Sequence, residues 1–311
     1  MSKNGNETST ITLGKLQAWM KAGRLTQSAV AKRLGYNEAT VSRYLAGNYA
    51  GDVRELETVI EDVLAAEARR QSWASFYVET DGCALATTML ELTREACDVG
   101  LVTGAAGLGK TTACNRYAAA NKSAIMITLA EGSGDNWTII RRLFEAMETR
   151  AWARKSGDLT RGEFVMERLK NSGRLIIVDN AQRATLSGLR WLLDLHDFAG
   201  VPVALIGNPD VLTRLDNSDQ LSSRIGLRKD IGLDCDDWIE GASDALVAAM
   251  WPKAPEEVKL LARETARGTG HLRRLVKQLR IAIKLCESTA WFGKSAKAFV
   301  EARALVGAEG E

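Results

Sequence analysis

The sequence predicts an α/β protein, with a parallel sheet in the middle of the chain and all-helical segments at both ends. Two observations lead to this class. In the middle of the chain, short apolar runs typical of strands buried on both faces alternate with amphipathic helical stretches. Before residue 72 and from Asp236 onward, apolar residues instead recur at helical spacing.

The composition is that of an ordinary globular protein. With 311 residues, 46% of them hydrophobic and 26% charged, the chain can bury a normal core in two or three domains. Five cysteines without a C-x-x-C pair, and only two histidines, favour neither a disulfide framework nor a zinc site. No apolar run could span a bilayer and the N-terminus is polar, so we expect no membrane partner and a cytoplasmic location.

The first segment of the chain predicts two short helices joined by a turn. The first covers residues 25–34 and ends at Gly35, and the second covers residues 36–45, with Asn37 as its N-cap. Helical spacing predicts a small apolar core, made of Ala29, Val30, Leu34, Val41 and Leu45. This arrangement is typical of a helix-turn-helix module, which binds DNA or another protein.

Charge favours DNA for this module. The whole chain has a formal net charge of only +2, but the bases of residues 15–51 face a single acid, Glu38. Lys32 and Arg33 could reach phosphates. The second helix turns Thr40, Ser42 and Arg43 outward, with Tyr44 beside them.

The remaining elements follow in order. A charged helix covers residues 53–72, and a linker or docking strand lies near residues 73–82. Apolar strands are predicted at residues 99–103, 124–129, 175–178, 201–206 and near 227–233. The helices between them cover residues 111–121, 136–155 and 186–198, and a last helix includes Phe299 and Leu305. These elements divide into three domains: 1–70, 71–233 and 234–311.

A glycine-rich motif stands between the first predicted strand and its helix. Gly104, Ala105, Ala106, Gly107, Leu108, Gly109, Lys110 and Thr111 fit G-x-x-x-x-G-K-[ST], and Thr112 follows. Backbone N–H groups of such a loop, together with a helix N-terminus, bind phosphates. Lys110 supplies a charge for the β- and γ-phosphates of ATP, and Thr111 a hydroxyl for Mg²⁺.

An acid at the end of the third strand completes this site. Asp179 follows four apolar residues, at the strand end where parallel sheets bind ligands, and should hold Mg²⁺. The next residue is Asn180, where a hydrolase of this kind usually has a glutamate. An amide cannot take a proton from the attacking water. Either hydrolysis is slow, or Gln182, Glu131 or an arginine supplies enough of the missing catalysis.

The order of these motifs resembles the AAA+ ATPases. The resemblance implies a P-loop five-stranded sheet with a C-terminal helical lid. It makes Asn208 the polar residue that senses the γ-phosphate, and Arg224 the finger that reaches a neighbour's nucleotide. It also places Arg273, with Arg274 as the fallback, on the lid, and puts Val78 and Thr80 near the adenine.

More closely, nearly the whole chain resembles the target-DNA-binding ATPases of transposing phages, the family of the phage Mu transposition protein B. That resemblance implies assembly of ATP-bound copies into a helical filament or ring on double-stranded DNA with little sequence preference. It also implies delivery of that DNA to a transposase in a bacterial host. Two alternatives remain: an ATP-gated helix-turn-helix transcription regulator, and a helicase-loader-like ATPase. In the family reading, Arg150 and Arg154 face DNA; otherwise they lie on a solvated helix face.

Overall fold

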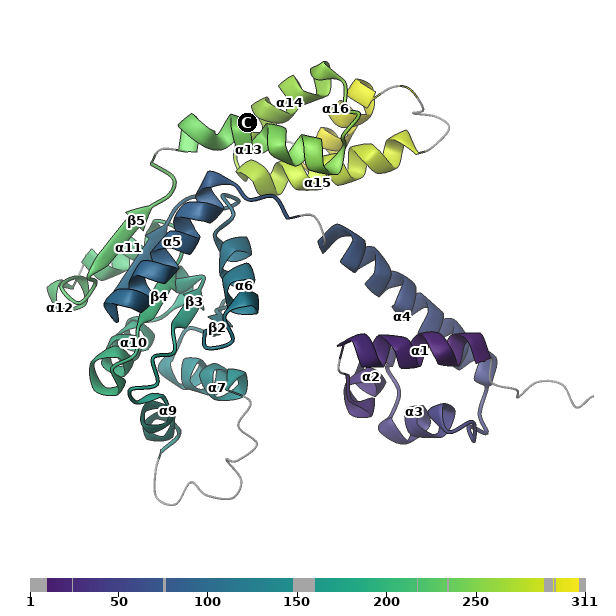
Figure 1. The fold of residues 1–311 in the computed structure, drawn as a ribbon, viewed down its shortest axis with the longest axis horizontal. Helices are drawn as coiled ribbons and strands as arrows, with labels where there is room; N and C mark the ends of the chain where they lie inside the picture. The colour runs from purple at the N-terminus through teal and green to yellow at the C-terminus, as the bar shows by residue number, and fades with distance from the viewer. Residues whose placement is uncertain are drawn as a thin grey trace, which may run out of the picture. The chain divides into compact units, whose positions relative to one another are not determined.

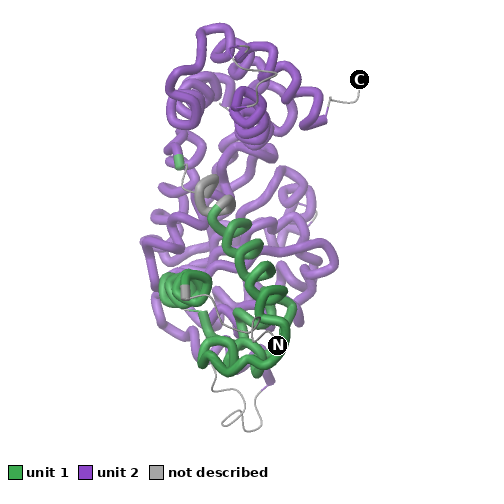
Figure 2. Tube along the Cα trace, turned by 90° about the vertical axis from the view of Figure 1, so that its right-hand side faces the viewer, with its two compact units in different colours: residues 1–77 green, residues 78–311 purple. Residues whose placement is uncertain are grey.

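The computed structural model describes two compact units, residues 1–77 and residues 78–311 (Figures 1 and 2). The described residues are 10–23, 25–74, 77–147, 160–216, 218–233, 235–287, 293 and 295–307. None of the helices in these ranges has the length and apolar character needed to cross a bilayer.

The N-terminal unit is all-α. Its helices are α1 (Thr10–Gly23), α2 (Gln27–Leu34), α3 (Glu38–Leu45) and α4 (Val53–Ala74). Local hydrogen bonds set the ends of the two short helices: the Thr26 hydroxyl accepts from the backbone N–H of Ala29, and the Asn37 side chain accepts from Thr40 N–H at 2.7 Å. Gly35 ends α2 in the left-handed conformation, as its position in the sequence predicts.

The side chain of Tyr44 corrects one expectation for this unit. Tyr44 is fully buried instead of facing outward, and its hydroxyl donates a 2.9 Å hydrogen bond to Glu57 on α4. The reason is helical spacing: Tyr44 lies three residues after Val41, on the side of α3 that packs into the core. Leu45, predicted to be a core residue, is only partly buried.

The second unit contains the predicted five-stranded parallel sheet. The strands are β1 (Val99–Thr103), β2 (Ile125–Thr128), β3 (Ile176–Asp179), β4 (Val203–Ile206) and β5 (Leu227–Asp230), and their order is β2-β3-β4-β1-β5. The register pairs Asp179 with Thr128 on one side and with Ile206 on the other. The polar residues that follow these strands therefore gather at one edge of the sheet.

Helices cover this sheet. The described helices are α5 (Asp81–Ala96), α6 (Lys110–Ala120), α7 (Asn136–Ala146), α9 (Arg161–Leu169), the short 3₁₀ turn η1 (Ala181–Arg183), α10 (Leu186–Ala199), α11 (Asp210–Asp216) and α12 (Asp219–Ser222). The helix predicted over 136–155 ends at Ala146, with Met147 as its C-cap, and residues 148–155 lie outside the described residues. The sequence pattern did not predict α5, which packs against α6 and β1.

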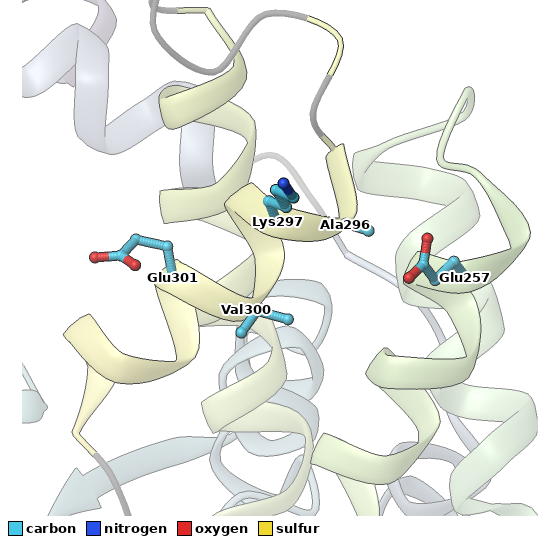
Figure 3. A pocket seen from close by; sticks show the side chains of 5 residues that line it. All are labelled: Glu257, Ala296, Lys297, Val300 and Glu301. Atoms are coloured by element: carbon cyan, nitrogen blue, oxygen red, sulfur yellow. The ribbon is translucent and has the colours of Figure 1, made fainter.

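The C-terminal part of this unit is all-helical, as predicted. It comprises α13 (Cys235–Met250), α14 (Glu256–Arg267), α15 (His271–Cys286) and α16 (Ser295–Val306). The buried amide of Gln278 joins three of them: it accepts from Thr265 of α14 and donates to the carbonyl of Phe299 in α16. A shallow pocket between α14 and α16, lined by Glu257, Ala296, Lys297, Val300 and Glu301, lies on this helical lid (Figure 3).

Candidate nucleotide-binding site

The glycine-rich loop connects the end of β1 to the first residue of α6. Gly104, Gly107 and Gly109 have φ angles of 151°, 99° and 96°. Residues with a side chain rarely adopt such angles, so the loop can follow this path only with glycine at these positions. The path brings the loop directly to the N-terminus of α6, where unpaired backbone N–H groups and the helix dipole favour an anion.

Lys110 is buried beside this loop. Its Nζ donates hydrogen bonds to the carbonyls of Gly104 at 2.6 Å and of Ala105 at 2.8 Å. Burial lowers the pKa of Lys110 to about 8, while the nearby carboxylates of Asp179 and Asp230 act in the opposite direction. The neighbouring carboxylates therefore only partly offset the cost of burying the charge of Lys110. An anion bound in the loop, such as a nucleotide phosphate, would stabilise the charged form of Lys110 further.

Thr111 and Asp179 lie next to each other at the same edge of the sheet. The Thr111 hydroxyl donates to both carboxylate oxygens of Asp179, at 3.2 and 3.0 Å. Asp179 is only 2% exposed, and burial raises the pKa of its carboxyl. A hydroxyl and a carboxylate are hard oxygen ligands, so this pair fits Mg²⁺ held beside a bound triphosphate.

Helix α5 follows the segment predicted to lie near the adenine, and it contacts the glycine-rich loop. Thr80 caps α5 by accepting from Cys83 N–H, and Val78 precedes it on the same segment. The Cys83 thiol donates to the carbonyl of Gly109 at 3.5 Å. A Cβ on Gly109 would lie 2.6 Å from the Cys83 sulfur, so helix and loop are in direct contact.

The helical lid also contacts the loop. A Cβ on Gly107 would lie 2.0 Å from the carbonyl oxygen of Gly270, at the start of α15, and 3.3 Å from Cβ of Arg273. The charge of Arg273 acts on both Lys110 and Asp179, so the predicted lid arginine does lie near the phosphate site. Its neighbour Arg274 instead donates to the carbonyl of Gly307.

A second lid contact was not predicted as part of the site. Trp238 on α13 packs on Gly82, where a Cβ would lie 2.7 Å from the indole ring and 2.7 Å from the carbonyl of Leu108. Trp238 is 8% exposed. A glycine in the first turn of α5, two residues after the N-cap Thr80, was the available signal, but spacing alone cannot identify a partner 156 positions away.

Asn180 has a structural role beside Asp179. It adopts the left-handed conformation, with φ 59° and ψ 42°, and its Nδ2 donates to the carbonyl of Leu129 at 3.3 Å. Asparagine tolerates this conformation better than most residues with a side chain. Its amide therefore joins the end of β3 to the segment after β2.

The other two polar candidates are also hydrogen-bonded. Asn208 follows β4, and its side chain donates to Asp210 and accepts from the Asp210 backbone N–H. The Gln182 side chain accepts from the Asn208 backbone N–H at 3.3 Å. Glu131 is exposed in the turn after β2.

Arg224 and the residues predicted to contact DNA belong to other segments of the chain. Arg224 forms ion pairs with Asp194 and Asp197 of α10. In the N-terminal unit, Lys32, Ser42 and Arg43 are exposed. The Arg33 guanidinium lies 5.4 Å from the ring centroid of Trp19, and the Thr40 hydroxyl donates to its own N-cap, Asn37. Arg150 and Arg154 lie outside the described residues.

The parallel sheet, the phosphate loop and the Thr111–Asp179 pair are those of the AAA P-loop fold. Residues 93–215 match the AAA domain family. The chain is similar to the Mu-like prophage FluMu DNA transposition protein B of Haemophilus influenzae, at 26% identity over 206 residues, which cover 65% of this chain and 71% of the relative. It is also similar to the ATP-dependent target DNA activator B of Escherichia phage Mu, at 24% identity over 266 residues and 83% of each chain. These homologues confirm the resemblance to phage Mu transposition protein B.

Two solved structures support the fold. The ORC2 protein of Aeropyrum pernix aligns with a TM-score of 0.55 at 17% identity, over 74% of this chain and 68% of that one. Cdc6p of Pyrobaculum aerophilum aligns with a TM-score of 0.54 at 17% identity, over 69% of this chain and 65% of that one. At this identity the likeness establishes the AAA fold and nothing of the function.

Proposed function

We propose that this protein is an ATP-dependent DNA-binding ATPase that assembles on target DNA and delivers it to a transposase. The observation that carries the proposal is the phosphate loop with its neighbours. Buried Lys110 and the Thr111–Asp179 pair offer the groups that a metal-bound triphosphate needs. The relatives are named for DNA transposition and for ATP-dependent activation of target DNA, which gives this site its context.

The reaction is the hydrolysis of ATP to ADP and phosphate. Lys110 exchanges its two loop carbonyls for phosphate oxygens, and the N–H groups at the start of α6 bind the same charge. Thr111 and Asp179 would hold Mg²⁺, which would neutralise negative charge on the bound phosphates. Arg273 of the lid adds a cation beside Gly107 of the loop.

Hydrolysis on this site is slow in the isolated chain. The Asn180 amide donates to the Leu129 carbonyl and cannot accept a proton from water. A missing general base typically costs about 10²–10⁴ in rate. Arg224, supplied by a neighbouring copy, is the group that raises the rate upon assembly.

DNA is held by the N-terminal unit and by the assembled ATPase units. In the N-terminal unit, α2, the turn at Gly35 and α3 form a helix-turn-helix, and the exposed Lys32, Ser42 and Arg43 face DNA. A phosphate contact, such as the one expected of Lys32, carries little sequence information, which fits a protein that accepts many targets.

The test is ATP-dependent binding to plain duplex DNA by the Lys110→Ala variant. The phosphates lose their buried cation, so DNA binding that depends on ATP should disappear, while the variant keeps its fold by circular dichroism. Lys122→Ala, which removes an exposed lysine just after α6, is the control and should bind as the parent does. Unchanged ATP-dependent binding by Lys110→Ala would refute the coupling.

The position of Asn180 also supports a second function, an ATP-gated transcription regulator in which nucleotide binding only switches assembly. Footprinting separates the two. Continuous protection along unrelated DNA supports target capture, whereas protection at one discrete operator supports regulation.

A further inference from the structure

Two arginines, Arg224 and Arg228, lie on the segment that runs from the end of α12 into β5, which we call the rim. Arg228 donates to the carbonyl and the hydroxyl of Ser222, both at 2.7 Å, and forms an ion pair with Asp216 at 3.4 Å. Arg228 thereby fixes the turn that carries Arg224, so that the Arg224 side chain starts from a defined position.

Arg224 itself is held by two carboxylates of the same chain. Its Nη1 lies 3.0 Å from Oδ1 of Asp194, and its Nη2 lies 3.4 Å from Oδ2 of Asp197. The two acids are three residues apart and lie on the same side of α10. All three side chains are about two-fifths exposed: 39% for Arg224, 41% for Asp194 and 39% for Asp197.

We propose that Asp194 and Asp197 form a latch that holds Arg224 in the free chain and must release it before it can reach the nucleotide of a neighbouring copy. The proposal rests on the proposed function, because it takes Arg224 as the residue that acts on the neighbour. One guanidinium has five N–H donors in a plane, so it cannot pair fully with two carboxylates of its own chain and with the triphosphate of another.

The exchange favours assembly only when ATP is present. The γ-phosphate of a triphosphate binds arginine bidentately, whereas ADP lacks the γ-phosphate that a rim arginine reaches. The latch therefore raises the protein concentration needed for assembly, and it makes assembly depend more strongly on the nucleotide.

The test replaces both acids with amides of the same shape, in the variant Asp194→Asn/Asp197→Asn. An exposed ion pair shifts an equilibrium by about 1.4- to 5-fold. Loss of both pairs should lower the protein concentration for half-maximal assembly on duplex DNA with ATP by about 2- to 25-fold, measured by light scattering. The control, Glu91→Gln/Glu95→Gln, removes the same charge from the exposed side of α5 and leaves both Arg224 pairs and the Arg228 contacts in place.

The outcomes separate the latch from the function on which it rests. The latch is supported if the protein concentration for half-maximal assembly falls in Asp194→Asn/Asp197→Asn and not in the control. The latch is overturned if this concentration does not fall, if it rises, or if it falls equally in the control. If Arg224→Ala assembles as the parent does, the action of Arg224 on a neighbour is itself wrong. If Arg224→Ala fails to assemble while Asp194→Asn/Asp197→Asn matches its control, only the latch fails.

Discussion

Substituting Gly107 by alanine tests whether the contact between the lid and the phosphate loop supports nucleotide binding. The new Cβ would lie 2.0 Å from the carbonyl oxygen of Gly270, and the residue would have to keep a φ of 99°. Such backbone strain costs about 1–3 kcal/mol, and the clash adds to it, because the obstacle is backbone and cannot rotate away. Either the loop leaves its phosphate-binding path or the lid moves off.

A cost of about 2–3 kcal/mol corresponds to a loss of nucleotide affinity of about 30- to 150-fold. The assay is an equilibrium titration with a fluorescent ATP analogue. Gly241→Ala is the matched control: Gly241 lies within α13 with nothing within 4 Å of its new Cβ, so affinity should stay the same. The control should also gain about 0.5–1 kcal/mol in the free energy of unfolding. Binding of Gly107→Ala within threefold of the parent would refute this reasoning.

Two further predictions concern Lys110 and Asn180. Because burial holds the pKa of Lys110 at about 8 and a bound triphosphate raises it, binding takes up a proton at higher pH. Nucleotide affinity should be highest below pH 8 and should fall by up to about tenfold per pH unit above it. In Lys110→Arg, whose guanidinium does not titrate in this range, the affinity should change less with pH in titrations from pH 7 to 9.5. Asn180→Ala puts an unsuitable residue at φ 59° and removes the bond to Leu129, so thermal unfolding should show a loss of about 1–2 kcal/mol. Asn180→Gly keeps the backbone freedom and should lose less; a larger loss for glycine than for alanine would contradict this account of the turn.

Much of the fold could be predicted from the sequence, because its signals are local. Apolar runs gave the strands of the sheet, and the spacing of Gly104, Gly109 and Lys110 gave the phosphate loop. The N-cap at Asn37 and the turn at Gly35 were equally local, since the side chain or φ angle of one residue decides each.

The predictions that failed or were missing involve partners that are distant in the sequence. Helical spacing from Val41 puts Tyr44 on the core side of α3, but its buried hydroxyl needs the partner Glu57 on α4, 13 positions away, which the pattern within α3 does not reveal. The ion pairs of Arg224 lie 30 and 27 positions away along the chain. The contact of Trp238 with Gly82 depends on how the lid packs, which helical periodicity does not report.

The two carbonyl bonds of Lys110 bear on how quickly ligand is replaced. Because Lys110 already bonds two carbonyls of the loop, the loop keeps its conformation without a ligand. A triphosphate that binds then replaces these two hydrogen bonds and does not have to order the loop. Under the proposed function, association then needs no preceding rearrangement of the loop, so differences in nucleotide affinity should appear mainly in the rate at which the nucleotide dissociates.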